Sequence, residues 1–186
     1  AFYLPYVLPA AAVYIGWSWL YNTEWGLFNY ILSKLGIERL MFVSSSSQVV
    51  PSLALIAVWL SGNLIVIFLA GLQNVPRVYH EAAEIDGANA WQKFKNITLP
   101  AISPTMFFLL VTGIINVLQE FTRSQVWNTS GGPNGKGITI VFYLYREAFD
   151  YNNMGHASAV AWILSIMIVI VTIINFVVSK KWVKYD

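Results

Sequence analysis

The sequence predicts an all-α protein whose helices cross a membrane as a bundle. Composition is one reason, because 57% of the 186 residues are hydrophobic and 11% are charged, whereas soluble domains carry about a quarter charged residues. The second reason is four stretches without any charged residue, at 2–20, 49–72, 104–118 and 157–178. A helix needs about 20 apolar residues to cross the hydrocarbon core, so we expect about four spans.

The four stretches differ in how clearly they read as spans. The clearest is 157–178, which ends at Ser179-Lys180-Lys181, whereas 104–118 is short and marginal alone. Pro5 and Pro9 lie within the first stretch. Prolines are tolerated in a first helical turn or where neighbouring helices compensate for the lost hydrogen bond. The chain opens inside an apolar run without a Met, so we expect an N-terminally truncated domain.

The connections between these stretches set the predicted orientation. The connection 21–48 contains a short amphipathic piece near residues 27–32, and 119–156 contains a glycine-rich turn at 130–135 and a helix over 138–149. Lys and Arg gather on the cytoplasmic side of membrane proteins. The connection 73–103 and the C-terminal tail hold a small excess of them, namely Arg77, Lys93, Lys95, Lys180, Lys181 and Lys184. We therefore expect 73–103 and both chain ends in the cytoplasm.

Composition also excludes several kinds of site. Cysteine is absent, which removes thiolate metal sites, disulfides and cysteine nucleophiles. The net charge of +2 and the scattered basic residues do not favour nucleic acid as a partner. His80 and His156 stand alone, and Glu81 and Glu84 have no indicated cleft, so we expect no metal site and no catalytic residue. Residues 131–137 lack the spacing of a phosphate-binding loop, so ATP must bind another chain.

Residues 80–100 predict a helical elbow between two spans. Residues 80–86 are good helix formers, Gly87 permits a bend that other residues resist, and 88–96 predicts a second helix. Leu99-Pro100 should end that helix, because the residue before a proline avoids helical angles. Trp91 and Phe94, three residues apart, could provide an apolar anchor for a partner's groove.

This segment resembles the signature of ABC importer permeases. The pattern is Glu81-Ala82-Ala83, then Gly87, then Ile97 and Leu99-Pro100; the longer form, with Asp86, Ala88, Trp91 and Phe94, resembles the branch of the maltose and glycerol-phosphate permeases. The resemblance covers essentially the whole chain. It includes Phe2-Tyr3-Leu4-Pro5-Tyr6 and stretches at 66–73, 131–133, 143–149 and 155–159.

The resemblance implies a single permease domain over 1–186, with 73–103 as its cytoplasmic coupling loop. Relatives usually have six spans, so these four would be the last four. The implied function is sugar import by alternating access in a bacterial or archaeal cell membrane. The implied partners are nucleotide-binding ATPase subunits that hold ATP and Mg, a paralogous second permease subunit, an extracytoplasmic solute-binding protein and membrane lipid. The implied coupling residues are Glu81, Ala82, Ala83, Asp86, Gly87, Trp91, Phe94, Leu99 and Pro100.

Polar residues within or next to the spans are the candidates for the substrate path. Polar groups inside a membrane are costly and tend to face a cavity. Asn63, Asn116, Gln119 and Glu120 meet this description, although hydrogen bonding between helices would explain them as well. An ion-coupled secondary transporter is the alternative function, but such proteins usually place carboxylates within spans, and none lies centrally here. A membrane-embedded enzyme would need a polar catalytic cluster, which the sequence does not show.

Overall fold

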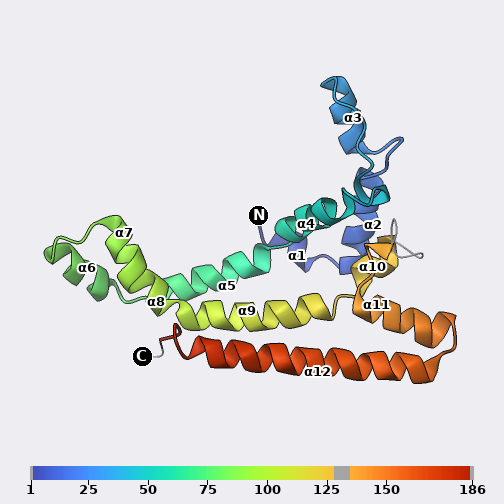
Figure 1. Ribbon diagram of the computed structural model, residues 1–186. Helices are drawn as coiled ribbons and strands as arrows, with labels where there is room; N and C mark the ends of the chain where they lie inside the picture. The colour runs from blue at the N-terminus through green and yellow to red at the C-terminus, as the bar shows by residue number, and fades with distance from the viewer. Residues whose placement is uncertain (1, 128–134, 185–186) are drawn as a thin grey trace. The chain divides into compact units, whose positions relative to one another are not determined.

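Helices form all the regular secondary structure of the described residues. The computed structural model describes residues 2–127 and 135–184, and no strand occurs among them. Figure 1 labels the α-helices; η1 is a 3₁₀ turn, whereas η2 and η4 are π-helical turns. The bounds are α1 Leu4–Val7, α2 Ala10–Leu20, α3 Leu27–Lys34, η1 Phe42–Ser44, α4 Val49–Trp59, α5 Gly62–Gln73, α6 Arg77–Ile85, α7 Ala90–Lys93, η2 Phe94–Thr98, α8 Leu99–Ala101, α9 Ser103–Leu118, α10 Thr122–Trp127, α11 Ile140–Tyr145, η4 Arg146–Asp150 and α12 Met154–Ser179. The predicted all-α class is confirmed.

Two segments are long and apolar enough to cross a membrane. One is α12, with 26 residues, and the other is Ser103–Trp127, whose 25 residues include α9 and α10. The pair α4 and α5 qualifies only when it is counted as one broken span. The described residues therefore provide two candidate spans, or three with the broken pair.

The predicted first span, 2–20, is not one continuous helix. It is divided into α1 and α2, and Leu8 between them is extended, with φ −71° and ψ 145°. Pro9 explains the break, because the residue before a proline avoids helical angles and the ring collides with the preceding turn. With 11 residues, α2 alone is about 16 Å long, about half the thickness of the hydrocarbon core.

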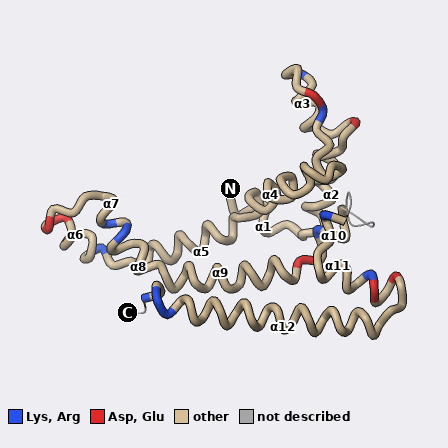
Figure 2. Tube along the Cα trace, viewed as in Figure 1, with Lys and Arg blue, Asp and Glu red and all other residues tan. Residues whose placement is uncertain are grey.

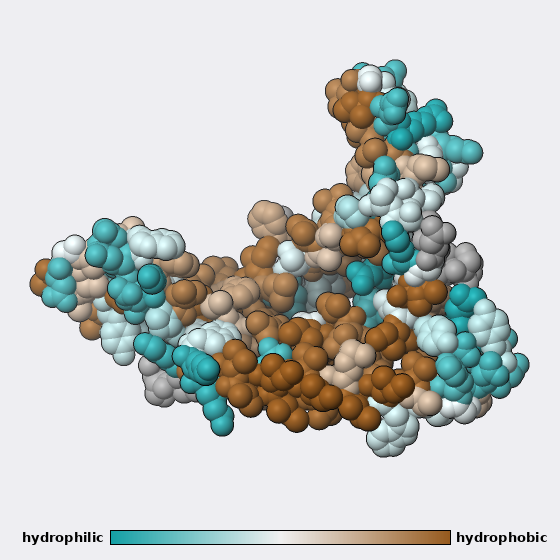
Figure 3. All heavy atoms as spheres, viewed as in Figure 1, coloured by the Kyte–Doolittle hydropathy of each residue, from teal (hydrophilic) through white to brown (hydrophobic). Residues whose placement is uncertain are grey.

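Apolar side chains cover much of α12. Figure 3 shows a nearly continuous apolar surface along this helix. Eleven of its large apolar residues are at least half exposed, namely Met154, Trp162, Ile163, Ile166, Val169, Ile170, Ile173, Ile174, Phe176, Val177 and Val178. Monomeric soluble proteins rarely expose an apolar patch of this extent. The chain is an integral membrane protein, and this face suits lipid or a neighbouring helix.

The chain forms two compact units. The first unit consists of Ala1–Gly62 and Leu118–Leu164. Its core is Val13, Tyr14, Trp17, Tyr21 and Ile56. The Trp127 indole N–H donates a hydrogen bond to the Tyr14 carbonyl at 2.7 Å, and the Tyr21 hydroxyl donates to the Ser52 carbonyl at 3.0 Å. These bonds attach α10 to the middle of α2 and α4 to Tyr21, directly after α2.

The second unit consists of Asn63–Val117 and Ser165–Asp186. Its helix α9 contacts α5 through Gly71, where a Cβ atom would lie 2.9 Å from Thr105 Oγ1. On α12, the ring of Phe176 packs edge-on against Phe107, with centroids 5.0 Å apart. Small residues let membrane helices approach closely, so Gly71 permits the contact between α5 and α9.

The predicted connections are found where the structure describes them. The helix expected over 138–149 is α11 followed by the π-helical turn η4, and the amphipathic piece near 27–32 is α3. The predicted glycine-rich turn lies outside the described residues except for Gly135.

Candidate functional site

Residues 73–103 form a helical elbow that joins α5 to α9. We call these residues the elbow; its first arm is α6, and its second arm is α7 continued by η2 and α8. Figure 2 shows charges of both signs on the elbow and none on α5 or α9. A charged segment between two uncharged helices lies outside the hydrocarbon core, because charges within it are costly.

The bend between the two arms occurs at Gly87, as predicted. Gly87 has φ +75°. Its N–H donates to the Glu84 carbonyl at 3.0 Å, and the Ala88 N–H donates to the Ala83 carbonyl at 2.9 Å. These two bonds form a Schellman motif, which ends a helix with a left-handed residue, usually glycine. The helix α6 therefore ends because Gly87 adopts a backbone angle that other residue types adopt less readily.

Side-chain interactions fasten the second arm to the first. The Asn89 side chain accepts a hydrogen bond from the Gln92 N–H at 2.9 Å, and the Gln92 side chain accepts one from the Asn89 N–H at 2.8 Å. This reciprocal capping box starts α7. Lys93 Nζ then lies 2.6 Å from Glu84 Oε1. The hydrogen bond and charge of Lys93 hold the pKa of Glu84 below its usual range.

The second arm continues past Leu99-Pro100, which corrects the predicted end of the helix. Leu99 has helical angles, φ −63° and ψ −45°, and α8 includes Pro100. A proline ring normally collides with the carbonyl four residues earlier. Here η2 precedes the proline, and its wider π-helical turn moves that carbonyl away. The arm therefore reaches Ala101, and only Ile102, with φ −89° and ψ 0°, separates it from α9.

Each arm of the elbow exposes large apolar side chains. On α6, Val78 and Ile85 are 67% and 89% exposed. They lie seven residues apart, and the exposed Glu81 lies between them. On the second arm, Trp91 and Phe94 are also exposed, with ring centroids 5.7 Å apart. Apolar residues at helical spacing are typical of a helix that docks in a partner's groove.

Sequence reasoning identified only some of these exposed residues. It selected Glu81, Trp91 and Phe94 but missed Val78 and Ile85. The seven-residue spacing of these two residues on either side of Glu81 was the available signal. Without a structure, however, the same spacing indicates a buried core face equally well. Their exposure in the structure excludes the core reading.

Other predicted site residues line a cavity inside the elbow. Ala82 and Ala83 from α6, and Asp86 directly after it, line a cavity of about 420 Å³ together with Pro100. The remaining lining residues are Tyr79, Asn96, Ile97, Ala101 and Lys184. Leu99 is 37% exposed. The predicted coupling residues thus divide into an exposed group and a cavity group, with Gly87 at the bend.

The four candidates for the substrate path do not form one site. Asn63 is half-buried on α5 and Asn116 is exposed on α9. Neither makes a side-chain hydrogen bond within residues 2–127 and 135–184. Gln119 is exposed, whereas Glu120 accepts a hydrogen bond from the Arg123 N–H at 2.9 Å and so caps α10. The described residues also contain no group of three or more His, Asp or Glu side chains suited to a metal.

Comparison with known proteins identifies the family of this chain. The binding-protein-dependent transport system inner membrane components match residues 2–183. The chain belongs to this family. The probable ABC transporter permease protein YesP of Bacillus subtilis (strain 168) is 37% identical over 188 aligned residues, which cover 100% of the chain and 60% of YesP. The arabinooligosaccharides transport system permease protein AraP of the same organism is 39% identical over 160 residues, or 86% of the chain and 51% of AraP.

A solved structure shares the fold of this family member. It is a bacterial alginate ABC transporter in complex with an alginate pentasaccharide-bound periplasmic protein. The matching covers 99% of the chain and 64% of the transporter chain, with a TM-score of 0.77 and 22% identity. The chain thus spans about half to two thirds of the length of the proteins it matches.

Proposed function

We propose that this chain is part of the membrane-spanning permease subunit of an ATP-driven importer that depends on a solute-binding protein. The observation that carries the proposal is the elbow. It is a charged segment between uncharged helices, and it exposes apolar side chains at the spacing of a docking helix. The family of the chain supports the same function. In this proposal the subunit forms the translocation path and moves by alternating access.

The elbow docks on a separate ATPase in this proposal. Val78, Ile85 and Trp91 provide apolar anchors for a groove of the ATPase, and Glu81 pairs with a basic group at the rim. Buried aromatic and aliphatic anchors carry most of the energy of such interfaces. ATP and Mg bind to the ATPase, so this chain itself is not an enzyme. Movement of the groove on ATP binding then reaches the spans through the two arms.

The proposed solute is a sugar or a sugar-like molecule. AraP is named for arabinooligosaccharides, and the similar solved structure is an alginate transporter. An extracytoplasmic solute-binding protein delivers the solute, and a paralogous permease subunit completes the path. Asn63, Asn116 and Gln119 remain the candidates for residues that face the path. Because Glu120 caps α10, we rank it below these three.

The proposed location is the cell membrane of a bacterium or archaeon, which is the inner membrane where two membranes exist. The elbow and the C-terminus lie on the cytoplasmic side, where ATP is available. The basic residues Lys180, Lys181 and Lys184 after α12 support this orientation.

Co-purification of the ATPase tests the proposal. The full-length chain is expressed with its genomic neighbours, solubilised and purified through a tag on this subunit. We expect an ATPase to co-purify with the wild type, and Ile85→Asp and Trp91→Asp each to weaken its binding by about 2 kcal/mol or more, as at interface hot spots. Ile37→Asp is the matched control, because Ile37 is 50% exposed and lies outside the elbow.

The outcomes separate the two candidate functions. Loss of the ATPase from both elbow variants, with retention in Ile37→Asp, supports the importer. A well-folded wild type that binds no ATPase even at low salt would contradict it. The ion-coupled secondary transporter would then become the better hypothesis.

A further inference from the structure

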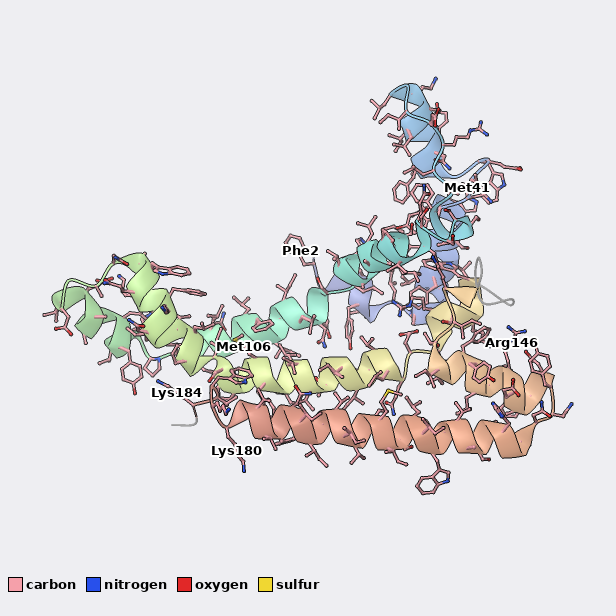
Figure 4. All side chains as sticks on the ribbon, viewed as in Figure 1. Phe2, Met41, Met106, Arg146, Lys180 and Lys184 are labelled. Atoms are coloured by element: carbon pink, nitrogen blue, oxygen red, sulfur yellow. The ribbon has the colours of Figure 1, made fainter. Side chains whose placement is uncertain are left out.

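The chain turns back on itself directly after α12. We call residues 180–184 the C-terminal tail. The Trp182 N–H and the Val183 N–H both donate to the Ser179 carbonyl, at 3.1 Å and 2.8 Å. Figure 4 shows Lys180 at the end of α12 and Lys184 beside the start of α9. The tail thus leads back toward the junction between the elbow and α9.

A single buried hydroxyl joins the tail to this junction. Ser103, the first residue of α9, is 2% exposed. Its Oγ accepts a hydrogen bond from the Lys184 N–H at 2.9 Å and donates one to the Pro100 carbonyl at 2.7 Å. Tail, α8 and α9 therefore meet at one side chain. A buried polar group that loses its partner is costly, so this arrangement favours an attached tail.

Two further contacts hold the tail in place. The indole of Trp182 packs edge-on against Phe107, with centroids 6.4 Å apart, and Phe107 also contacts Phe176 of α12. Lys184 lines the elbow cavity together with Ala82, Ala83 and Asp86. The tail therefore contacts α9 and lies against the cavity between the two arms.

The position of these contacts matters because the backbone angles change at the junction. Ile102, with φ −89° and ψ 0°, separates α8 from α9. Helical hydrogen bonds still cross it, from the Ile102 N–H to the Thr98 carbonyl at 3.0 Å and from the Met106 N–H to the Ile102 carbonyl at 2.9 Å. Residues between two helices can absorb a bend, and a segment that holds both sides of Ile102 would resist bending there when a force acts on the elbow.

We propose that the C-terminal tail is that segment, a clamp that fixes the second arm of the elbow to α9 and so lets the elbow move the spans as a rigid lever. Ser103 and Trp182 are its positioning residues. This inference rests on the proposed function, because a clamp on the elbow matters only if the elbow receives the movement of an ATPase.

The test uses the assembled transporter with its ATPase and binding protein. The clamp variants are Ser103→Ala and Trp182→Ala, and Trp182→Phe is the conservative variant that keeps a ring against Phe107. Trp162→Ala is a matched control, because Trp162 is 69% exposed on α12, the helix that precedes the tail. Ser33→Ala is the second control, since the Ser33 hydroxyl donates to the carbonyl three residues earlier, as Ser103 does, but is exposed.

Spin labels report on bending at the junction directly. These 186 residues contain no cysteine, so Lys95→Cys on the second arm and Val117→Cys on α9 give one defined pair of labels once any cysteine elsewhere in the transporter is replaced. We expect a narrow distance distribution in the wild type and in both controls. Ser103→Ala and Trp182→Ala should broaden it, and Trp182→Phe should restore it. A role in folding alone would lower the yield of folded protein without broadening the distribution.

Coupling is measured on the same variants. We expect Ser103→Ala and Trp182→Ala to keep their ATPase, while transport and binding-protein-stimulated ATP hydrolysis fall about fivefold or more, a typical size for coupling between sites. Wild-type coupling together with a narrow distance distribution in both variants would overturn the clamp. A wild type without an ATPase would instead contradict the proposed function, and the label distances would still test the clamp.

Discussion

At Gly87 one backbone angle determines how the elbow is built. A φ of +75° is open to glycine but costs other residues, because their Cβ collides with the following carbonyl. No other group lies within 4 Å of a Cβ added at this position. The requirement for glycine is therefore conformational, and packing does not contribute to it.

Gly87→Ala should loosen the elbow by about 1 kcal/mol, the cost of one non-glycine residue in the left-handed region. Hydrogen exchange of the 73–103 amides in detergent micelles measures this loss. Gly113→Ala is the control, because Gly113 lies in α9 with open space around it and a normal backbone angle. Equal exchange in the two variants would show that the turn does not depend on the left-handed angle.

The ion pair between Glu84 and Lys93 adds a pH dependence to the elbow. Its bond, 2.6 Å long, links positions nine residues apart and so fixes the angle between the arms. Lys93 lowers the pKa of Glu84, chiefly through the hydrogen bond and then through its charge. A lowered pKa in the folded state means that the pair stabilises the elbow above the ordinary glutamate pKa. The stabilisation is lost as the pH falls through the lowered value.

Glu84→Gln and Lys93→Gln should each remove this pH dependence. We expect the wild-type elbow to lose protection against hydrogen exchange between neutral and acidic pH, after correction for intrinsic exchange. Both variants should show a smaller loss, because no ionised pair is left to protonate. Lys95→Gln is the control on the same arm and should behave as the wild type. A wild-type pH profile in Glu84→Gln would mean that the pair contributes nothing.

At the scale of elements, the contact between α5 and α9 anchors both ends of the elbow. Gly71 precedes the elbow and Thr105 follows it, and only the missing side chain of Gly71 allows their close approach. Because both helices pack here, the two ends of the elbow are held at a fixed separation. In the proposed function, its arms then transmit a displacement to the spans.

Gly71→Leu should lower thermal stability in detergent by about 1–3 kcal/mol, the usual cost of overpacking. Thr105→Ala removes the Oγ1 and Cγ2 atoms that the new side chain meets, so the double variant should recover part of the loss. Non-additivity of this kind is expected for residues in contact. Gly16→Leu is the control, because no other group lies within 4 Å of a Cβ there. Strict additivity would contradict the contact.

At the scale of the whole molecule, the chain alternates between uncharged helices and charged connections. The proposed orientation places the elbow and the tail on one side of the membrane and the connection 21–48 on the other. Without native cysteines in these residues, single replacements give a clean test with a label that cannot cross the membrane.

Lys95→Cys and Lys181→Cys should react with the impermeant label only after the membrane is opened, whereas Glu38→Cys should react with it in intact cells. The physical reason is the excess of Lys and Arg expected on the cytoplasmic side. Labelling of Glu38→Cys after denaturation controls for its general reactivity. Reaction of Lys95→Cys in intact cells would reverse the proposed orientation and remove the elbow from the ATPase.

The sequence by itself determined the features that depend on local chemistry. Composition and long uncharged stretches predicted a helical membrane protein, and the Glu81-Ala82-Ala83 and Gly87 pattern located the elbow. Both follow from short-range rules, since hydropathy determines whether a helix lies in lipid or in water and glycine permits a left-handed turn. The same rules misjudged residues 2–20, because a long apolar stretch outweighed the effect of Pro9.

Only the tertiary structure decided which residues act together. The continuation of the second arm through Pro100 depends on a π-helical turn that no sequence rule indicated. The exposure of Val78 and Ile85 and the bond from the tail to Ser103 depend on how distant segments pack. Lys184 and Ser103 lie 81 positions apart, and periodicity reports only on neighbours within a few turns. Packing between such distant segments therefore determined which elbow residues are exposed and where the tail lies.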